Sequence, residues 1–188
     1  MNAAPNKKRC DGHSVAVIIV DPRLGILIGN ISDGRGASGV GGHVKDDFKS
    51  YVEAAHGEVR EETGLTVTSL TPLFDDEVWR DNPCKRGDGP YGMGHFWQVY
   101  VAEAEGCLNP DKGSFSKMRW VSRADLQKLV GRTLLRVRGE LTDEEWVSEP
   151  GITFSWVRWL AEADLITVTE PELREIEEFM LTDETNRP

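Results

Sequence analysis

Three glutamates stand close together in the first third of the chain. Glu58, Glu61 and Glu62 are spaced at i, i+3 and i+4, so an α-helix would place their carboxylates on one side. Like charges on one side of a helix repel one another, which favours a compensating cation. Mg²⁺ takes oxygen ligands and is commonly held by a few carboxylates together with substrate phosphates. The spacing therefore indicates a site for Mg²⁺ or Mn²⁺, or alternatively a solvated charged face with Arg60 as counter-ion.

The segment around these glutamates has the features of a helix. Ser50 precedes Glu53 by three residues, as in a capping box, and Gly64 is typical of a helix end. We therefore expect a helix over residues 51–63. The apolar stripe beside the glutamates, which should face the core, consists of Val52, Ala55 and Val59.

With the glycines before it, this segment resembles the Nudix box of the Nudix hydrolases. From Glu58 to Leu65 the chain follows the family order of Glu, apolar, any residue, Glu-Glu, any residue, Gly, apolar. The first half differs, because Lys49 replaces a glutamate, Gly57 replaces an arginine, and Gly42 lies one residue earlier than the leading glycine. In the family those two missing side chains hold the loop and the helix together, whereas the last three glutamates bind metal.

The resemblance implies a role for each residue of the site. Glu58, Glu61 and Glu62 would bind the metal together with the carbonyl of Gly41, and Glu61 or Glu58 would act in catalysis, since the family varies in which glutamate activates water. The implied reaction is hydrolysis of the diphosphate linkage of a nucleoside diphosphate derivative by attack of water on phosphorus. Such a reaction independently requires neutralisation of the phosphate oxygens, which divalent cations provide.

Substrate contacts are expected between residues 75 and 94, where aromatic and cationic side chains could stack on a base and pair with phosphates. The candidates are Trp79, Arg80, Lys85, Arg86 and Tyr91. A plain surface loop is the alternative interpretation. Asp111 and Glu105 are candidates for a base in a later loop. The sequence does not separate a nucleoside triphosphate from a nucleotide sugar, a dinucleoside polyphosphate or ADP-ribose.

Two other functions compete with hydrolysis. A Nudix-like binding or regulatory module without catalysis would agree with the altered Lys49 and Gly57. Isomerisation of an isoprenoid diphosphate would need a catalytic cysteine in the pocket, and neither Cys84 nor Cys107 stands in a motif for this. With Cys10, the widely spaced cysteines predict neither a disulfide framework nor a zinc site, so free thiols in a reducing compartment are expected.

The resemblance implies an α+β fold, a Nudix-type α/β/α sandwich with a mixed β-sheet, to which the chain would add a C-terminal helical extension. A hairpin, later strands at 95–103 and 118–121, and a helix from Ser122 to about Val130 follow the family order. The glycine-dense stretch 34–42 predicts a loop that is flexible or approaches a ligand. We expect a flexible arm over 1–13, a Nudix domain over 14–135, and an acidic helical extension over 136–188 that packs on the domain through apolar stripes.

Charge and hydropathy limit the partners. The net charge of the 188 residues is −10, but residues 139–188 carry −11 and residues 1–138 carry +1. Non-specific nucleic-acid binding is therefore not expected, whereas a small phosphorylated substrate is compatible with the near-neutral part. Apolar runs are too short for a membrane span, which predicts a cytoplasmic protein without a membrane partner. A homodimer is compatible with the sequence.

Overall fold

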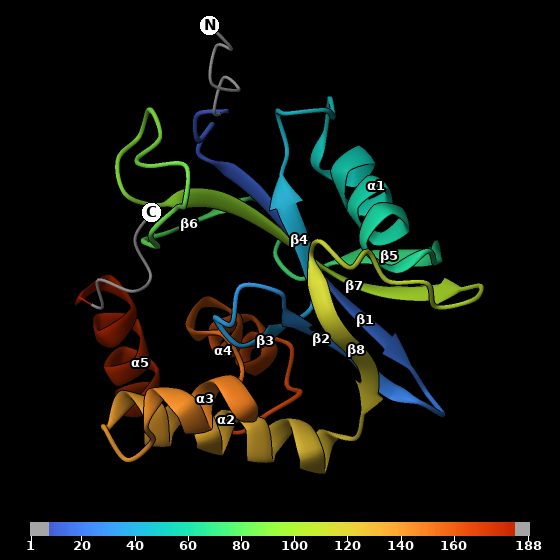
Figure 1. Cartoon of the computed structure of the whole chain (residues 1–188). Helices are drawn as coiled ribbons and strands as arrows, with labels where there is room; N and C mark the ends of the chain where they lie inside the picture. The colour runs from blue at the N-terminus through green and yellow to red at the C-terminus, as the bar shows by residue number, and fades with distance from the viewer. Residues whose placement is uncertain (1–7, 183–188) are drawn as a thin grey trace, which may run out of the picture.

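The computed structural model describes residues 8–182, and an eight-stranded mixed sheet forms its centre (Figure 1). The strands are β1 (His13–Asp21), β2 (Gly25–Ile31), β3 (Ala37–Ser38), β4 (Val40–His43), β5 (Thr66–Pro72), β6 (Val78–Arg80), β7 (His95–Glu105) and β8 (Phe115–Val121). The helices are α1 (Tyr51–Thr63), α2 (Arg123–Val137), α3 (Asp143–Ser148), α4 (Phe154–Glu162) and α5 (Glu170–Thr182).

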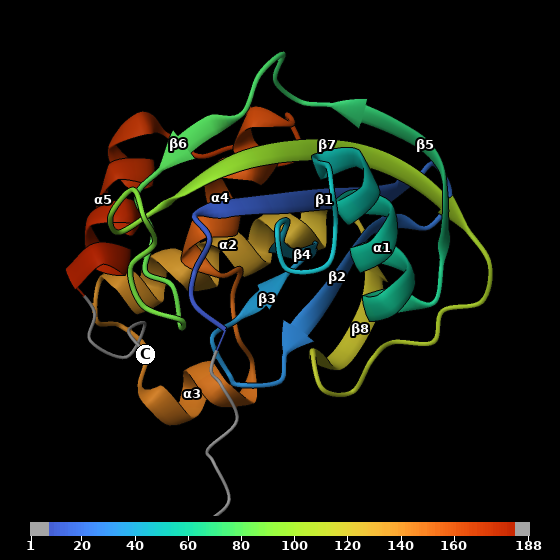
Figure 2. The same cartoon turned by 90° about the horizontal axis from the view of Figure 1, so that it is seen from above.

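The sheet follows the order β3-β2-β1-β7-β5, while β4 pairs with β1, β6 with β7 and β8 with β2. Strands β1 and β7 are parallel, and the other pairs are antiparallel. Helix α1 covers one face, and α2, α4 and α5 lie on the other (Figures 1 and 2). The predicted α/β/α sandwich with a mixed sheet and added C-terminal helices is therefore confirmed.

Strand β1 shows why two helical layers form. Its apolar residues are buried on both faces, as expected for a central strand with a parallel neighbour. Val15 and Val17 belong to the core cluster beneath α1, whereas Ala16 and Ile18 belong to the cluster beneath α2 and α4. Because successive side chains of a strand point to opposite faces, one unbroken apolar run supplies both cores.

The helix predicted over residues 51–63 has those bounds. Ser50 accepts a hydrogen bond from the backbone N–H of Glu53 at 3.1 Å, and Gly64 ends the helix in the left-handed conformation with φ 76°. Helix α2 begins after Ser122 as predicted but continues to Val137 instead of ending near Val130. Its buried face continues through Thr133, and tertiary packing of that face outweighs the weak helix propensity of the intervening glycine.

The C-terminal helices pack closely on the sheet. The N–H of Ala37 in β3 donates to Gly151, and Thr153 donates back to Ala37, each at 2.8 Å. The predicted apolar stripes of α4 and α5 enter the core with the sheet and α2; their buried members are Trp156, Leu160, Leu173, Ile176 and Met180.

Residues at the end of the expected N-terminal arm and in the glycine-dense stretch pack against the sheet. Of the arm expected over 1–13, residues 1–7 lie outside the described residues, whereas Cys10 and Gly12 are buried. The glycine-dense stretch is partly extended, because its residues form β3 and β4, and Gly41 and Gly42 pair with Ala16 and Val15 of β1. The expectation of a loop over 34–42, flexible or close to a ligand, is therefore wrong for its second half in that these residues form strands.

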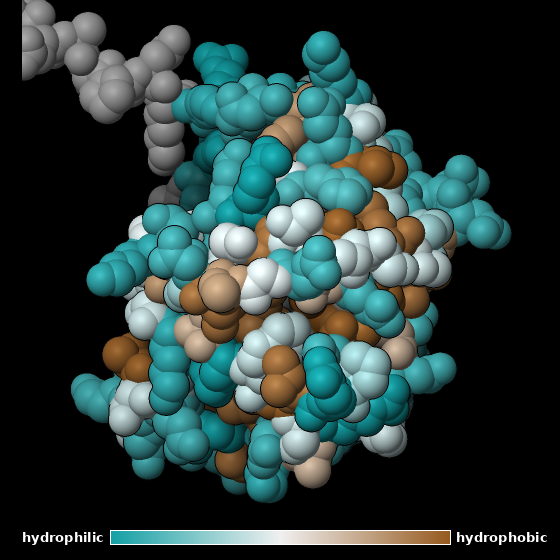
Figure 3. Space-filling model, turned by 90° about the vertical axis from the view of Figure 1, so that its right-hand side faces the viewer, coloured by the Kyte–Doolittle hydropathy of each residue, from teal (hydrophilic) through white to brown (hydrophobic). Residues whose placement is uncertain are grey.

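Within residues 8–182, no helix is both long enough and apolar enough to cross a membrane. The face shown in Figure 3 is covered mainly by hydrophilic residues, with apolar ones distributed between them.

Candidate active site

Helix α1 holds its three glutamates beside strand β4. Ala55 and Val59 are fully buried against the sheet, so Glu58 and Glu62 lie at the margin of the buried face. Both of these glutamates are partly buried, whereas Glu61 is exposed. The three carboxylates thus occupy one side of α1, two of them against the sheet and one in solvent.

The backbone of β4 lies directly against two of the carboxylates. The N–H of Gly41 donates to Oε2 of Glu62 at 3.3 Å. In an antiparallel ladder a residue directs its N–H and C=O to the same edge, so the Gly41 carbonyl also faces away from β1. A Cβ at position 42 would lie 1.8 Å from Oε1 of Glu58, so only glycine leaves room for this carboxylate.

Burial and mutual repulsion change the acidity of these groups. Burial, followed by the nearby Glu61 carboxylate, raises the pKa of Glu58 to about 7. Burial, followed by the charge of Glu58, raises the pKa of Glu62 to about 8. Among the described residues, no lysine, arginine or histidine forms an ion pair with any of the three glutamates. A bound cation would favour the ionised carboxylates and thus offset this unfavourable burial.

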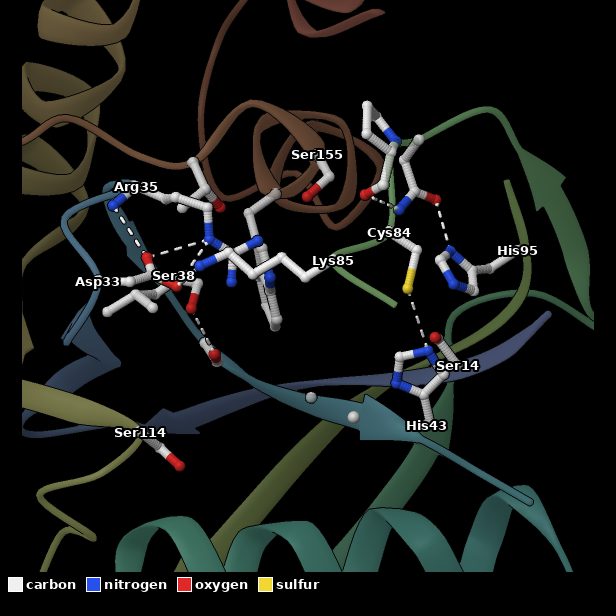
Figure 4. Close-up of a pocket in the computed structure, with 18 of the residues that line it drawn as sticks. Ser14, Asp33, Arg35, Ser38, His43, Cys84, Lys85, His95, Ser114 and Ser155 are labelled. Atoms are coloured by element: carbon white, nitrogen blue, oxygen red, sulfur yellow. Dashed lines mark hydrogen bonds and ion pairs between the residues drawn. The ribbon is translucent and has the colours of Figure 1, made fainter. Parts of the chain in front are cut away.

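A cavity of about 590 Å³ adjoins this part of the sheet, and Gly41, Gly42 and Glu62 are among the residues that line it. Its size lies in the range of small-molecule sites. The loop before β3, the loop after β6 and the start of α4 form other walls, and Figure 4 shows Lys85 reaching toward the middle.

Three cations line the same cavity and are held by aspartates. Lys85 and Arg35 both contact Asp33, the latter through Nε at 3.0 Å. Arg86 Nη1 lies 2.5 Å from Asp46. These cations give the cavity groups that can pair with an anion.

Only two of the five predicted substrate contacts line this cavity. Lys85 and Arg86 do so. Trp79 and Arg80 line a separate cavity of about 400 Å³, where the Arg80 guanidinium lies 5.7 Å from the centre of the Trp159 ring. Tyr91 is exposed and packs its ring against other aromatic rings outside either cavity lining. The pairing of β6 with the start of β7 places Trp79 beside Phe96 and Arg80 beside the Trp159 ring, so a role of these residues in substrate binding stays a prediction.

The two later candidates for a base lie in different places. Asp111 is near the glutamates, since its backbone N–H donates to the carbonyl of Glu62 at 3.0 Å. Its carboxylate accepts hydrogen bonds from Ser114, first from the hydroxyl, and these lower its pKa. Glu105 is exposed at the end of β7, opposite Thr66, and does not line the cavity. Asp111 therefore remains a candidate on position, and Glu105 does not.

The structure explains two of the three departures from the Nudix box, those at Lys49 and Gly57. A Cβ at Gly57 would lie 2.2 Å from the ring of Phe48, so the ring fills the space of a side chain at that position. The N–H of Lys49 donates to the carboxylate of Glu53 at 2.9 Å. Phe48 and Glu53 thus hold the loop to the helix, the task that the family gives to an arginine and a glutamate.

Sequence reasoning missed the contribution of α4 to the cavity. Trp156, which the sequence assigned to packing alone, is buried and lines the cavity together with Ser155. Its ring lies where a Cβ at Gly39 would be, at 2.5 Å. The glycines of the stretch 34–42 were the available signal for this contact in the sequence. Glycine is required where another group approaches the backbone closely.

Comparisons with known proteins agree with this architecture. The family model of the NUDIX domain matches residues 12–141. The NUDIX domain of NrtR from Shewanella oneidensis, solved with ADP ribose, gives a TM-score of 0.55 at 15% identity and covers 87% of this chain and 92% of that one. A NUDIX-family hydrolase from Clostridium perfringens gives a TM-score of 0.46 at 23% identity and covers 62% of this chain and 85% of that one. A search of curated proteins gave no match.

The family match begins just before β1 and continues beyond α2, so it includes the whole sheet and the glutamate helix. It covers well over half of the chain. It also contains Glu58 and Glu62, the two glutamates of the Nudix box that lie against β4. The chain therefore belongs to the Nudix hydrolase family.

Proposed function

We propose that this protein is a metal-dependent hydrolase that cleaves the diphosphate linkage of a nucleoside diphosphate derivative. The observation that carries the proposal is the pair of carboxylates, Glu58 and Glu62, pressed against the β4 backbone without an ion-pair partner among the described residues. Glu62 lines a cavity that also contains cationic side chains. A site of this kind suits a divalent cation on one side and phosphate groups on the other.

The donor set fits Mg²⁺ or Mn²⁺. Glu58 and Glu62 would hold the cation, with Glu61 and the Gly41 carbonyl as further oxygen donors, and hard cations prefer such oxygen ligands. Bound there, the cation would neutralise charge on the diphosphate oxygens and promote attack by water. Exposed Glu61 is the residue that we assign to proton acceptance, with Asp111 as the alternative.

The cations of the cavity would bind the phosphates. Lys85 and Arg35 already share Asp33 as a partner, and both ion pairs are partly exposed. Such pairs contribute only about 0–1 kcal/mol, so exchanging the aspartate for a phosphate costs little. Arg86 and Lys85 lie in one loop, which would set the position of the diphosphate relative to Glu62.

The substrate class that we favour is a nucleoside diphosphate joined to a second group. The cavity is large enough for both halves of such a molecule, because its volume is in the middle of the range of about 300–1,000 Å³ for small-molecule sites. ADP-ribose, the molecule bound in the NrtR domain of similar fold, is the first compound to test. Nucleotide sugars, dinucleoside polyphosphates and nucleoside triphosphates complete the panel.

The test is hydrolysis of this panel with Mg²⁺ or Mn²⁺, followed by detection of mononucleotide or phosphate. We expect Glu58→Gln and Glu62→Gln to reduce turnover strongly, because each removes a charged ligand. Glu103→Gln is the matched control, since Glu103 is an exposed glutamate on β7 outside the cavity lining. Wild-type turnover in the two site variants would contradict the proposal.

A binding or regulatory module without catalysis is the second candidate, and the altered Lys49 and Gly57 are the observation that favours it. In this structure Glu53 and Phe48 hold the loop to the helix in place of the family glutamate and arginine. The structure therefore offers no reason for the loop to be misplaced. Calorimetric binding of one compound to both wild type and Glu62→Gln, without turnover of any compound by the wild type, would establish this second function.

A further inference from the structure

A second group of metal-ligating side chains lies beside the cavity. Cys10 precedes β1, His43 ends β4, Cys84 follows β6 and His95 begins β7. Their sulfur and ring nitrogen atoms, one from each residue, all lie within 4.8 Å of one another. Figure 4 shows the Cys84 sulfur directed toward His43, with His95 nearby. Four segments distant in sequence thus bring two thiols and two imidazoles to one place.

We propose that Cys10, His43, Cys84 and His95 bind a zinc ion. Zinc bound at about 2.3 Å from sulfur and about 2.0 Å from nitrogen in a tetrahedron places neighbouring ligand atoms about 3.3–3.8 Å apart. Cys10 Sγ lies 3.0 Å from Nε2 of His95, and Cys84 Sγ lies 3.5 Å from Nε2 of His43. The ligand atoms are therefore close to the separations that zinc requires, and small side-chain shifts complete the geometry.

Hydrogen bonds fix His95 in the form that a metal needs. Nδ1 of His95 lies 3.0 Å from Oδ1 of Asn82, and the indole N–H of Trp97 donates to the same oxygen at 3.1 Å. An indole N–H can only donate, so Asn82 must present its oxygen, and Nδ1 of His95 must carry the proton. The lone pair of Nε2 is therefore left facing Cys10. A ligand histidine whose other nitrogen donates to a fixed acceptor is the usual arrangement at zinc sites.

Each of the two sulfurs accepts a hydrogen bond from the backbone. The N–H of Gly12 donates to Cys10 Sγ and the N–H of Arg86 donates to Cys84 Sγ, both at 3.4 Å and both from two residues later in the chain. Zinc binds cysteine as the thiolate. Two thiolates with two neutral imidazoles carry a charge of −2, which one Zn²⁺ cancels. Neutrality matters here because Cys10 and His95 are buried, with 5% and 2% of their surfaces exposed.

The donor types distinguish this cluster from the glutamate site. Sulfur and imidazole ligands select zinc, whereas Mg²⁺ and Mn²⁺ prefer oxygen. Two other roles of the cysteines would leave the thiols in a different chemical state. A disulfide between Cys10 and Cys84 would remove both thiols, and a catalytic thiol at Cys84, as an isoprenoid diphosphate isomerase would need, would stay free and reactive. Cys84 does line the cavity, so this last use has to be tested.

Four protein ligands leave no open position, so the zinc would be structural. It would join the segment before β1 to β4, β7 and the loop that follows β6. Because Lys85 and Arg86 directly follow Cys84 and line the cavity, the ion would also fix the loop that carries them. The importance of this loop for catalysis rests on the proposed function, whereas zinc binding itself does not.

Metal analysis of the purified full chain tests the site without any substrate. We expect about one zinc ion per chain, since the four ligands make one tetrahedral site. Cys10→Ser and Cys84→Ser should lose the zinc, whereas Cys107→Ser should keep it, because Cys107 is the exposed cysteine outside the cluster. Asn82→Ala should retain the ligands but weaken zinc affinity by about 10–100-fold through loss of the partner of His95.

Cobalt provides a measurement on the unaltered protein, so the test does not depend on whether the serine variants fold. Co²⁺ added to the reduced, zinc-free wild type should give the intense visible bands of a tetrahedral ion and a sulfur-to-cobalt charge-transfer band. The proposal is overturned if the wild type contains no zinc and gives no such spectrum. Rapid alkylation of Cys84 in the native, zinc-treated protein, or a Cys10–Cys84 disulfide in the freshly purified protein, would also overturn it.

Limited proteolysis tests the effect on the loop separately. Trypsin cleaves after Lys85 and Arg86, so removal of zinc should accelerate cleavage at these residues several-fold, and restoring zinc should reverse the change. Cleavage after Lys117, in β8, serves as the internal reference. If zinc binds but leaves cleavage of the loop unchanged, the site stands and its role in holding the loop is refuted. Absence of hydrolase activity would affect neither measurement, so failure of the proposed function can be recognised independently.

Discussion

Replacement of Gly42 by alanine should displace Glu58 while leaving the fold intact. The new Cβ would lie 1.8 Å from Oε1 and 2.4 Å from Cδ of Glu58, well inside the contact distance of about 3.5 Å for non-bonded atoms. The nearest obstacles are the far end of a flexible side chain, so the carboxylate can move by rotation about its own bonds. It would have to move by more than 1 Å from its place against β4.

The expected loss of activity follows from this displacement. A misplacement of about 1 Å at a catalytic site can reduce the rate by about 100-fold, and Glu58 is a proposed metal ligand. We therefore expect Gly42→Ala to lower kcat/KM for the best substrate by about that factor and to weaken the stabilisation of the protein by added Mg²⁺. Thermal unfolding without added Mg²⁺ should be close to that of the wild type, since the backbone of β4 can keep its pairing with β1.

Gly131→Ala is the matched control for this variant. A Cβ at position 131 meets no atom within 4 Å, and the residue lies in the interior of α2. The change should raise stability by about 0.5–1 kcal/mol without changing activity. Wild-type kcat/KM in Gly42→Ala, with Mg²⁺ stabilisation retained, would refute the conclusion that Glu58 must lie against β4 for the site to work.

Three further predictions concern pH and packing. Because the folded-state pKa values of Glu58 and Glu62 are raised to about 7 and about 8, their contribution to stability is fully present below the ordinary carboxyl pKa and is lost as pH rises through these values. Urea unfolding between pH 5 and 9 should therefore show stability falling by up to about 1.4 kcal/mol per pH unit for each group, and added Mg²⁺ should reduce the fall. Trp156→Ala should lower the free energy of unfolding by about 3–5 kcal/mol, measured with urea, because a buried ring beneath β4 is lost. Restoring the family arginine with Gly57→Arg should destabilise by about 1–3 kcal/mol through collision with Phe48, and calorimetry should show that Phe48→Ala in the same chain relieves part of this loss.

Local signals were sufficient to predict α1 and the general fold. The bounds of α1 depend on Ser50 and Gly64, which act within their own helical turns, so the sequence contains all the information needed. The general fold followed from the likeness of the glutamate segment and of the order of elements to the Nudix family, and the buried apolar run of β1 agrees with a layer of helices on each face.

Long-range contacts explain what the sequence could not predict. The glycines of β4 look like loop residues until Glu58 and Trp156 are placed against them, from 16 residues downstream and from the C-terminal helices. The sequence likewise could not show that the pairing of β6 with β7 places Trp79 and Arg80 in the wall of the smaller cavity. Cys10 and Cys84 gave no zinc motif, because each ligand of their cluster comes alone from a different segment instead of in closely spaced pairs.

Strand β4 connects the two proposed metal sites. Successive residues of a strand face opposite ways, so Gly42 faces Glu58 and α1, while Gly41 and His43 direct their Cβ positions to the side of Trp156 and the cysteine cluster. On one side of this short strand lie the carboxylate oxygens of α1. On the other side lie the cysteine sulfurs and the imidazole nitrogens of the cluster. Because the two donor sets prefer different ions, Mg²⁺ should exchange freely while zinc stays bound. A movement of β4 caused by loss of zinc would shift Gly42 beneath Glu58, and so the structural site would determine the geometry of the catalytic one.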